Sequence, residues 1–204
     1  DNRKFTAYPE KNALSNCLKS IKGFGTIVGD ELYKISKNSY DNFLDLLVDM
    51  KNLKINKTQI EILIKLNYFE EFGKNKKLLY ILELFQNYMG KSQINKKIVN
   101  ENPNQWNLEI LKKYLIKECN SIYKVDFDKY IKEIFEKIED KSLSLREQLE
   151  FERKLLEIPI YVNKIIPSTW YYVLGFKVYN DKKNLPYLIL YQLQTGNIIK
   201  CSIN

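Results

Sequence analysis

The chain has 204 residues, of which 45% are hydrophobic and 28% are charged, a mixture typical of a folded protein rather than a membrane span. It contains no histidine, so the commonest general base and metal ligand are missing and the composition disfavours an enzyme. Cys17, Cys119 and Cys201 are too widely spaced for a zinc or redox motif, which indicates a reduced, cytoplasmic protein. We therefore expect no catalytic residue, cofactor, bound metal, small-molecule substrate or membrane partner.

The 33 Lys and Arg residues exceed the 25 Asp and Glu residues, and the formal net charge of +8 suits a polyanionic partner. Lys, Asn and Ile are all abundant, as in proteins of AT-rich genomes, so genome composition explains the charge equally well. The first residues, Asp1 to Phe5, contain neither an initiator Met nor the layout of a signal peptide. We expect the chain to be part of a longer protein.

The first informative segment is Ile21-Lys22-Gly23-Phe24-Gly25, which predicts a tight hairpin between two helices. A short helix is expected over residues 15–21 and should end at Gly23, because glycine readily adopts the left-handed conformation of a helix C-terminus. The second helix is expected to begin near Thr26. Its inner side should consist of Ile27, Val28, Leu32 and Ile35.

Three further helices are expected before residue 90. Ser39 is the expected N-cap of a helix whose inward stripe includes Phe43 and Leu47. Asn56 and Gln59 have the capping-box spacing at the start of the next helix. A turn over residues 67–73 then leads to the third helix, which carries Leu78, Leu82 and Phe85 in register.

Residues 90–106 combine glycine, proline and several asparagines, and we expect them to form a linker. A helical connector is expected over 107–168, with helices that begin after Asp126 and Ser144 and a break at Pro159. No sheet is expected before Pro159.

The spacing of apolar residues is no longer helical from Tyr171 onward, where aromatic and β-branched residues favour strands. Three antiparallel strands are expected over 169–204, joined by turns at 180–184 and 195–197, and these are too few to close a barrel. The expected fold class is therefore mostly α. It comprises a tandem helix-hairpin-helix bundle over 1–89, a linker, the helical connector and a small antiparallel β meander.

The first hairpin offers a site for a phosphate group. Its glycines let backbone N–H groups point outward, and the following helix adds its unpaired N-terminal donors and partial positive charge. Such contacts hold a nucleic-acid backbone and read no bases. A purely structural turn is the alternative, with Phe24 filling the core. The residues expected to contact DNA here are Lys19, Lys22, Gly23, Phe24, Gly25 and Thr26.

A second hairpin ends at Gly73, and the lysines that follow it, Lys74 and Lys76, are candidates for a second phosphate site. A solvated, lysine-rich helix start is the alternative. Two carboxylate pairs are the other candidates for chemistry, but Asp126 (with Asp128) is better explained as an N-cap and Glu70–Glu71 as loop charge.

Three motifs follow one another along the chain. They are Ile21-Lys22-Gly23-Phe24-Gly25, Leu63-Ile64-Lys65-Leu66-Asn67-Tyr68-Phe69-Glu70-Glu71-Phe72-Gly73 and Glu147-Gln148-Leu149-Glu150-Phe151-Glu152-Arg153-Lys154-Leu155-Leu156. In this order they resemble the C-family replicative polymerases, the alpha subunits of bacterial DNA polymerase III. The chain departs from that family where Asn67 and Tyr68 replace a Gly-Ala pair, and where residues 159–163 replace a Ser-Gly-His-Pro segment.

The resemblance implies a non-catalytic, DNA-binding fragment of a polymerase that grips the backbone of duplex DNA without sequence specificity during DNA replication. The β meander would be the start of an oligonucleotide-binding (OB) fold, and the nucleotidyltransferase centre would lie outside this chain. The implied partners are double-stranded DNA and other replisome subunits such as the sliding clamp. Two alternatives remain: a helical adaptor that docks proteins without touching DNA, and an enzyme such as a nuclease.

Overall fold

The structure, a computed structural model, describes residues 6–8, 13–15, 18, 21–53, 55–178 and 186–203. The chain divides into two compact units. The larger unit consists of Asp1–Lys19 and Gly23–Ser142, and the smaller unit of Ser20–Lys22 and Leu143–Asn204. This division differs from the domain boundaries expected from the sequence, because residues 90–142 pack with the helices that precede them.

The first part of the larger unit is helical after a short hairpin of two strands. In chain order its elements are β1 (Thr6–Tyr8), β2 (Ala13–Ser15), α1 (Thr26–Ile35), α2 (Phe43–Asn52), α3 (Lys57–Lys65), the 3-10 helix η3 (Glu70–Phe72) and α4 (Asn75–Tyr88). Burial of one stripe of each helix forms the core, because apolar residues recur at helical spacing. The most deeply buried of these are Phe43, Leu47, Met50, Ile60, Leu63, Ile64, Leu78, Ile81, Leu82 and Phe85.

The starts of these helices confirm part of the sequence analysis. Asn56 and Gln59 form the predicted capping box at α3. The N-cap of α2 is Asn42 rather than Ser39, because the Asn42 side chain accepts a hydrogen bond from the Asp45 N–H. Ile27 was expected on the inner side of α1 but is 62% exposed.

The helix expected over 15–21 is not a continuous helix in the described residues. Ser15 lies in β2, where Thr6 is its partner, and Leu18 lies in a single 3-10 turn. Residues 16, 17, 19 and 20 lie outside the described residues.

Residues 93–125 form a small sheet, and the expectation that no sheet precedes Pro159 is wrong. The elements are β3 (Gln93–Asn95), α5 (Lys96–Glu101), η4 (Pro103–Gln105), α6 (Leu108–Lys113), β4 (Leu115–Glu118) and β5 (Ile122–Val125), followed by α7 (Phe127–Lys137). The strands pair antiparallel in the order β3-β5-β4, so part of the expected linker is a strand and a helix. β4 and β5 are joined by only three residues, 119–121, which makes a hairpin, and β3 pairs with the other edge of β5.

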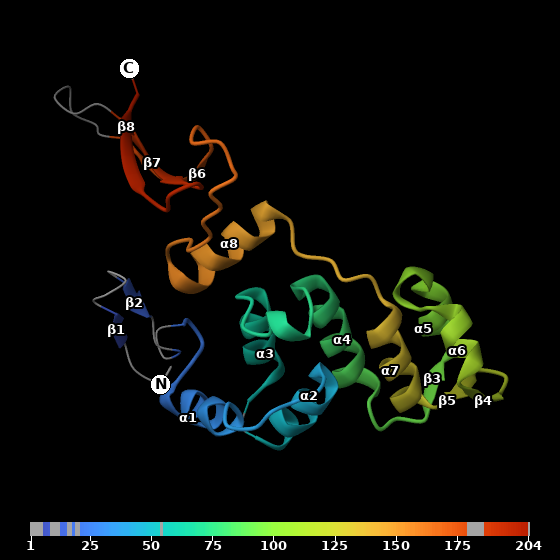
Figure 1. The fold of residues 1–204 in the computed structure, drawn as a ribbon. Helices are drawn as coiled ribbons and strands as arrows, with labels where there is room; N and C mark the ends of the chain where they lie inside the picture. The colour runs from blue at the N-terminus through green and yellow to red at the C-terminus, as the bar shows by residue number, and fades with distance from the viewer. Residues whose placement is uncertain are drawn as a thin grey trace. The chain divides into compact units, whose positions relative to one another are not determined.

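An aromatic cluster attaches this sheet region to α4, which lies between α3 and α7 in Figure 1. The ring of Tyr88 on α4 lies 5.1 Å from those of Trp106 and Phe127. Tyr130 extends the cluster along α7, with its centroid 6.2 Å from Phe127. Such ring pairs bury large apolar areas and explain why residues 90–142 belong to the larger unit.

The smaller unit packs the helix α8 (Leu145–Leu156) against the predicted meander of β6 (Tyr171–Lys177), β7 (Tyr187–Gln192) and β8 (Ile198–Ser202). Leu149, Tyr191 and Leu193 form its core. The buried Glu152 carboxylate accepts hydrogen bonds of 2.8 Å from the N–H groups of Ile160 and Tyr161. This contact fixes the chain directly after α8.

The predicted fold class, mostly helical with a terminal antiparallel meander, is confirmed. None of the helices in the described ranges is both long and apolar enough to cross a membrane.

Candidate nucleic-acid interface

The first hairpin, residues 21–26, is an exposed turn at the start of α1. Gly23 has a φ of +93°, in the region that favours glycine, and Gly23, Gly25 and Thr26 are all exposed. Gly25 has a φ of −104° and a ψ of 178°, which is extended backbone that any residue adopts. Only Gly23 therefore needs to be glycine for conformational reasons.

The N-terminus of α1 is suited to an anion. Its N-cap, Gly25, has no side chain to bind the first N–H groups, and its first turn carries no acidic residue. An α-helix leaves these N–H groups without intrahelical acceptors and concentrates partial positive charge there. Thr26 adds an exposed hydroxyl, and the exposed Lys22 precedes the turn in the chain.

Two contacts hold the first hairpin within the larger unit. The Gln59 side-chain amide donates a 3.3 Å hydrogen bond to the Gly23 carbonyl while its oxygen completes the α3 capping box. Ile62 packs so closely that a Cβ on Gly23 would lie 3.4 Å from its Cδ1. Phe24 is 8% exposed, which agrees with a core residue rather than a base-stacking one. Lys19 lies outside the described residues.

The second hairpin, residues 66–74, has a different backbone. Asn67 takes a φ of +60°, and the N–H groups of Asn67 and Tyr68 donate to the carbonyls of Ile64 and Leu63. This is the Schellman arrangement at a helix C-terminus, which usually requires glycine but accommodates asparagine. Asn67 thus provides the left-handed turn without a glycine.

The N-terminus of α4, which follows this hairpin, is already occupied by a carboxylate of the same chain. The Lys74 N–H, at the N-cap of α4, donates a 2.6 Å hydrogen bond to Oδ1 of Asp140. The Lys76 N–H donates to the Lys141 carbonyl at 3.1 Å. Gly73 allows this approach, since a Cβ there would lie 3.1 Å from Asp140 Oδ1.

The Lys74 side chain is also engaged. Its Nζ lies 2.6 Å from Oε1 of Glu70, and the hydrogen bond and charge of this carboxylate raise the pKa of Lys74. The two lysines proposed for a second phosphate site thus lie at one helix start. The carboxylates of Asp140 and Glu70 lie at the same helix start and occupy its donors.

Sequence analysis did not identify Asp140 as a functional residue. It lies 66 residues from Lys74, in a segment of irregular structure between α7 and α8. A Gly-Lys helix start predicts an anion, but it does not say whether that anion comes from a ligand or from the chain itself. The short acidic pair Glu139-Asp140 before Lys141 was the only local signal.

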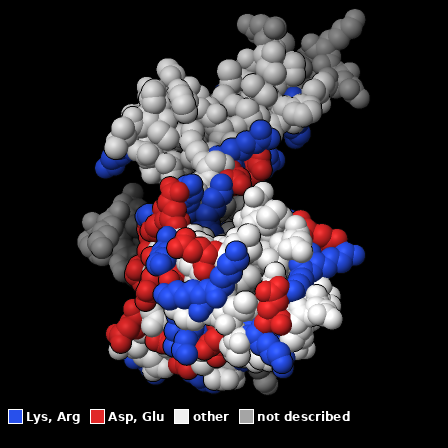
Figure 2. All heavy atoms as spheres, turned by 90° about the vertical axis from the view of Figure 1, so that its right-hand side faces the viewer, with Lys and Arg blue, Asp and Glu red and all other residues white. Residues whose placement is uncertain are grey.

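The net positive charge is not gathered over the face drawn in Figure 2. There, Lys and Arg side chains of the larger unit are interspersed with Asp and Glu. Ion pairs engage some of the lysines of this unit, such as Lys97–Glu101 on α5 and Lys113–Glu133 between α6 and α7. On this face, a contact with DNA would depend on local geometry more than on a broad basic surface.

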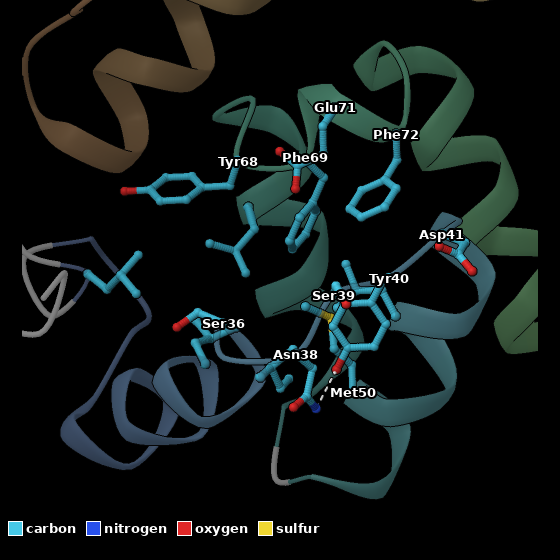
Figure 3. A pocket seen from close by; sticks show the side chains of 15 residues that line it. Ser36, Asn38, Ser39, Tyr40, Asp41, Met50, Tyr68, Phe69, Glu71 and Phe72 are labelled. Atoms are coloured by element: carbon cyan, nitrogen blue, oxygen red, sulfur yellow. Dashed lines mark hydrogen bonds between the residues drawn. The ribbon is translucent and has the colours of Figure 1, made fainter.

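A cavity of about 570 Å³ opens between α1, α2, α3 and the second hairpin. Figure 3 shows the rings of Tyr40, Phe69 and Phe72 around it. The exposed carboxylates of Asp41 and Glu71 also line it, and they oppose the entry of a phosphate. This cavity is not a suitable site for a nucleic-acid backbone.

Several of the carboxylates that the structure describes have capping and ion-pairing roles. Among the described residues, no group of three or more Cys, Asp or Glu could hold a metal ion. Asp126 is the N-cap of α7, as predicted, and accepts a hydrogen bond from the Lys129 N–H. Hydrogen bonds from Lys113, Lys137 and Tyr114 lower the pKa of the buried Glu133 to about 2, so this carboxylate is charged and structural at neutral pH.

The comparison with protein families supports a helix-hairpin-helix in the region of the two hairpins. Residues 2–79 match the family model described as a helix-hairpin-helix motif. The matched range contains both hairpins and the start of α4, and it covers less than half of the chain. A search of curated proteins found no match. The helix-hairpin-helix prediction is thus confirmed for this region, and the motif supports DNA binding that is independent of base sequence.

Proposed function

We propose that the chain binds the phosphate backbone of duplex DNA through its first hairpin and reads no base sequence. The observation that carries the proposal is the uncapped, exposed N-terminus of α1 within the range that matches the helix-hairpin-helix model. Backbone N–H groups at such a turn provide fixed donors for a phosphate oxygen. The exposed ammonium of Lys22 adds charge without base recognition.

The occupied second hairpin limits the number of phosphates that the chain neutralises. One open hairpin with Lys22 should neutralise about two phosphates, so log K should fall with log salt at a slope of about −2. Two open hairpins would give a slope nearer to −4, by the same estimate of about two phosphates for each hairpin.

The experiment is a titration of the full chain with duplexes of about 20 base pairs and unrelated sequences, between about 50 and 200 mM salt. We expect dissociation constants of about 10⁻⁴ to 10⁻⁶ M that are equal for all duplexes. A preference for one base sequence, or an affinity that does not change with salt, would contradict the proposal.

We further propose that the chain is a non-catalytic part of a C-family replicative polymerase. The support is the order of three motifs, at residues 21–25, 63–73 and 147–156, and the meander that follows them. On this proposal the chain acts in DNA replication in the cytoplasm, and its further partners are replisome subunits such as the sliding clamp.

This part of the proposal has its own test. The purified chain should neither extend a primer nor cleave DNA with magnesium present, because two-metal phosphoryl transfer needs a cluster of carboxylates. Turnover that disappears when a single carboxylate is replaced would contradict it.

A helical adaptor is the second candidate function, and one observation favours it. Cross-strand partners in the meander form an apolar surface on one sheet face, and Phe176 is 73% exposed there. Uncharged surfaces of this kind are typical of protein contacts rather than DNA contacts. The salt titration distinguishes the two functions. The residues of this face are Val173, Phe176, Leu188, Leu190, Ile199 and Cys201.

A further inference from the structure

The Asp140 carboxylate lies where a helix-hairpin-helix would place a phosphate oxygen. It accepts a hydrogen bond from the N-cap N–H of α4, directly after Gly73. The helix start that it occupies carries Lys74 and Lys76, the lysines expected to bind a phosphate. A phosphate bound in this way would need the same N–H donor and the same approach over Gly73.

We propose that Asp140 is an intramolecular gate on a second DNA-phosphate site at the start of α4. With Asp140 in place, the second hairpin is closed. When a backbone phosphate displaces the carboxylate, the Lys74 N–H and the lysine side chains bind DNA instead. The identity of the ligand rests on the proposed function, but the occupied site is a feature of the structure itself.

Asp140 differs from the carboxylates that have only a structural role. Glu152 also accepts backbone N–H groups, but it is 3% exposed and receives two of them together with the Gln148 amide. Asp140 is exposed and lies in a segment without regular secondary structure. A solvent-exposed carboxylate in such a segment is easily displaced, because water can rehydrate it.

Displacement of Asp140 by DNA also replaces one anion with another of the same charge. The carboxylate and a phosphodiester each carry one negative charge, so the helix start keeps an anion in both states. The neighbouring Lys141, paired with Glu139 at 2.6 Å, provides its carbonyl to the Lys76 N–H in the closed state. Opening the gate would release that N–H as a further donor.

The experiment compares Asp140→Ala with a matched variant, Asp128→Ala. Oδ1 of Asp128 accepts a 3.0 Å hydrogen bond from the Gly90 N–H, so both changes remove one charge and one carboxylate–backbone bond. Binding of the full chain to a duplex of about 20 base pairs is measured across about 50–200 mM salt.

We expect Asp140→Ala to steepen the salt slope by about one and to tighten binding about tenfold near 50 mM salt, since one more phosphate is neutralised. Asp128→Ala should leave the slope unchanged. Asp140→Asn keeps an acceptor for the Lys74 N–H and removes only the charge, so it should give an intermediate affinity, with Asp128→Asn as its control. If Asp140→Ala does not fold, the asparagine pair provides the same comparison.

The outcomes separate this proposal from the proposed function. If the unchanged chain binds DNA and the Asp140 and Asp128 variants are equal, Asp140 is only a helix cap and the gate is disproved. If the unchanged chain does not bind but Asp140→Ala does, the gate stands and the first hairpin is not the main site. If no variant binds DNA, both proposals are wrong.

Discussion

The helix starts that follow the two hairpins, those of α1 and α4, both lie in the larger unit but differ in their access to an anion. At the first hairpin, α1 begins after Gly25 with no capping side chain and no acidic residue in its first turn. At the second, α4 begins after Gly73 with the Asp140 carboxylate on its N-cap N–H and Glu70 on the Lys74 ammonium. One helix start is open to an anion, and the other already has one.

This difference shows that a helix-hairpin-helix motif does not by itself define a DNA contact. The donors and the flanking lysines are local properties, and both hairpins have them. At the second hairpin, however, the Lys74 N–H is already bonded to a residue 66 positions away, Asp140. The most direct test is therefore to add a carboxylate at the start of α1 or to remove the one at the start of α4, and to measure DNA binding.

The largest effect is expected at Gly73, because its backbone is the most restricted. Its φ of +143° and ψ of 177° lie in a region that is essentially confined to glycine. Gly73→Ala should reduce the free energy of unfolding by about 1–3 kcal/mol, through backbone strain and crowding against Asp140. Thermal or urea denaturation measures it.

Gly25→Ala is the control for this prediction. Its φ of −104° is open to all residues, and no atom lies within 4 Å of the added Cβ, so the loss should be only about 0.5 kcal/mol, from the poorer N-cap preference of alanine. Equal losses at the two glycines would show that Gly73 is not strained. The sequence predicted that both glycines of the first hairpin were needed for the turn, and the structure limits this need to Gly23.

Local patterns in the sequence were sufficient to predict most of the helices. Capping boxes at Asn56 and Ser144 fixed the starts of α3 and α8, because both partners of each box lie within one helical turn. The change to alternating apolar residues after Tyr171 located the meander for a similar reason. These features depend on neighbours in the chain, and a sequence contains that information directly.

Features that depend on distant partners were missed. Residues 93–95 form a strand only because Ile94 pairs with Tyr123 on β5. The Asn-rich segment itself contains no pattern that predicts this pairing. The role of Asp140 likewise exists only when α4 and the segment after α7 are side by side. The remaining site residues of the first hairpin, including Lys22, stay predictions until binding is measured.

The next effect in size should come from closing the first hairpin. Gly25→Asp would place a carboxylate at the N-cap of α1, where aspartate is a favoured capping residue. The helix should gain a few tenths of a kcal/mol, whereas DNA affinity should fall about tenfold near 50 mM salt. The salt titration should also become shallower by about one unit.

Gly25→Asn is the matched change, because it caps the same N–H groups without a negative charge. We expect it to retain more of the DNA affinity than Gly25→Asp at every salt concentration. If the two variants bind DNA equally well and as tightly as the unchanged chain, the N-terminus of α1 is not the phosphate site.

A smaller effect is expected at Lys22, which is exposed and contributes one charge. Lys22→Ala should make the salt slope shallower by about one and weaken all duplexes by the same factor, several-fold near 100 mM salt. The fold should be retained, because the backbone N–H that bonds the Leu155 carbonyl is unaffected. Lys132→Ala, on the exposed side of α7, is the control for the loss of one positive charge. Equal slopes for the two variants would favour the adaptor.

The smallest effect is expected at Glu70, and it should appear only when the gate is open. Glu70→Gln removes the partner that raises the pKa of Lys74, so this pKa should fall toward its ordinary value of 10.5 while the ammonium stays charged at neutral pH. In the unchanged chain, DNA affinity should not respond, because Asp140 still occupies the helix start.

In an Asp140→Ala background, the released ammonium can reach a phosphate, and Glu70→Gln should tighten binding by about twofold, the scale of one exposed ion pair. Glu101→Gln breaks a similar exposed pair with Lys97 on α5 and should have no effect in either background. The prediction is therefore a coupling between two sites, measured as a double-mutant cycle in DNA affinity. A zero coupling energy would mean that the Lys74 ammonium does not contact DNA. The backbone N–H of Lys74 could still bind a phosphate when Asp140 is absent.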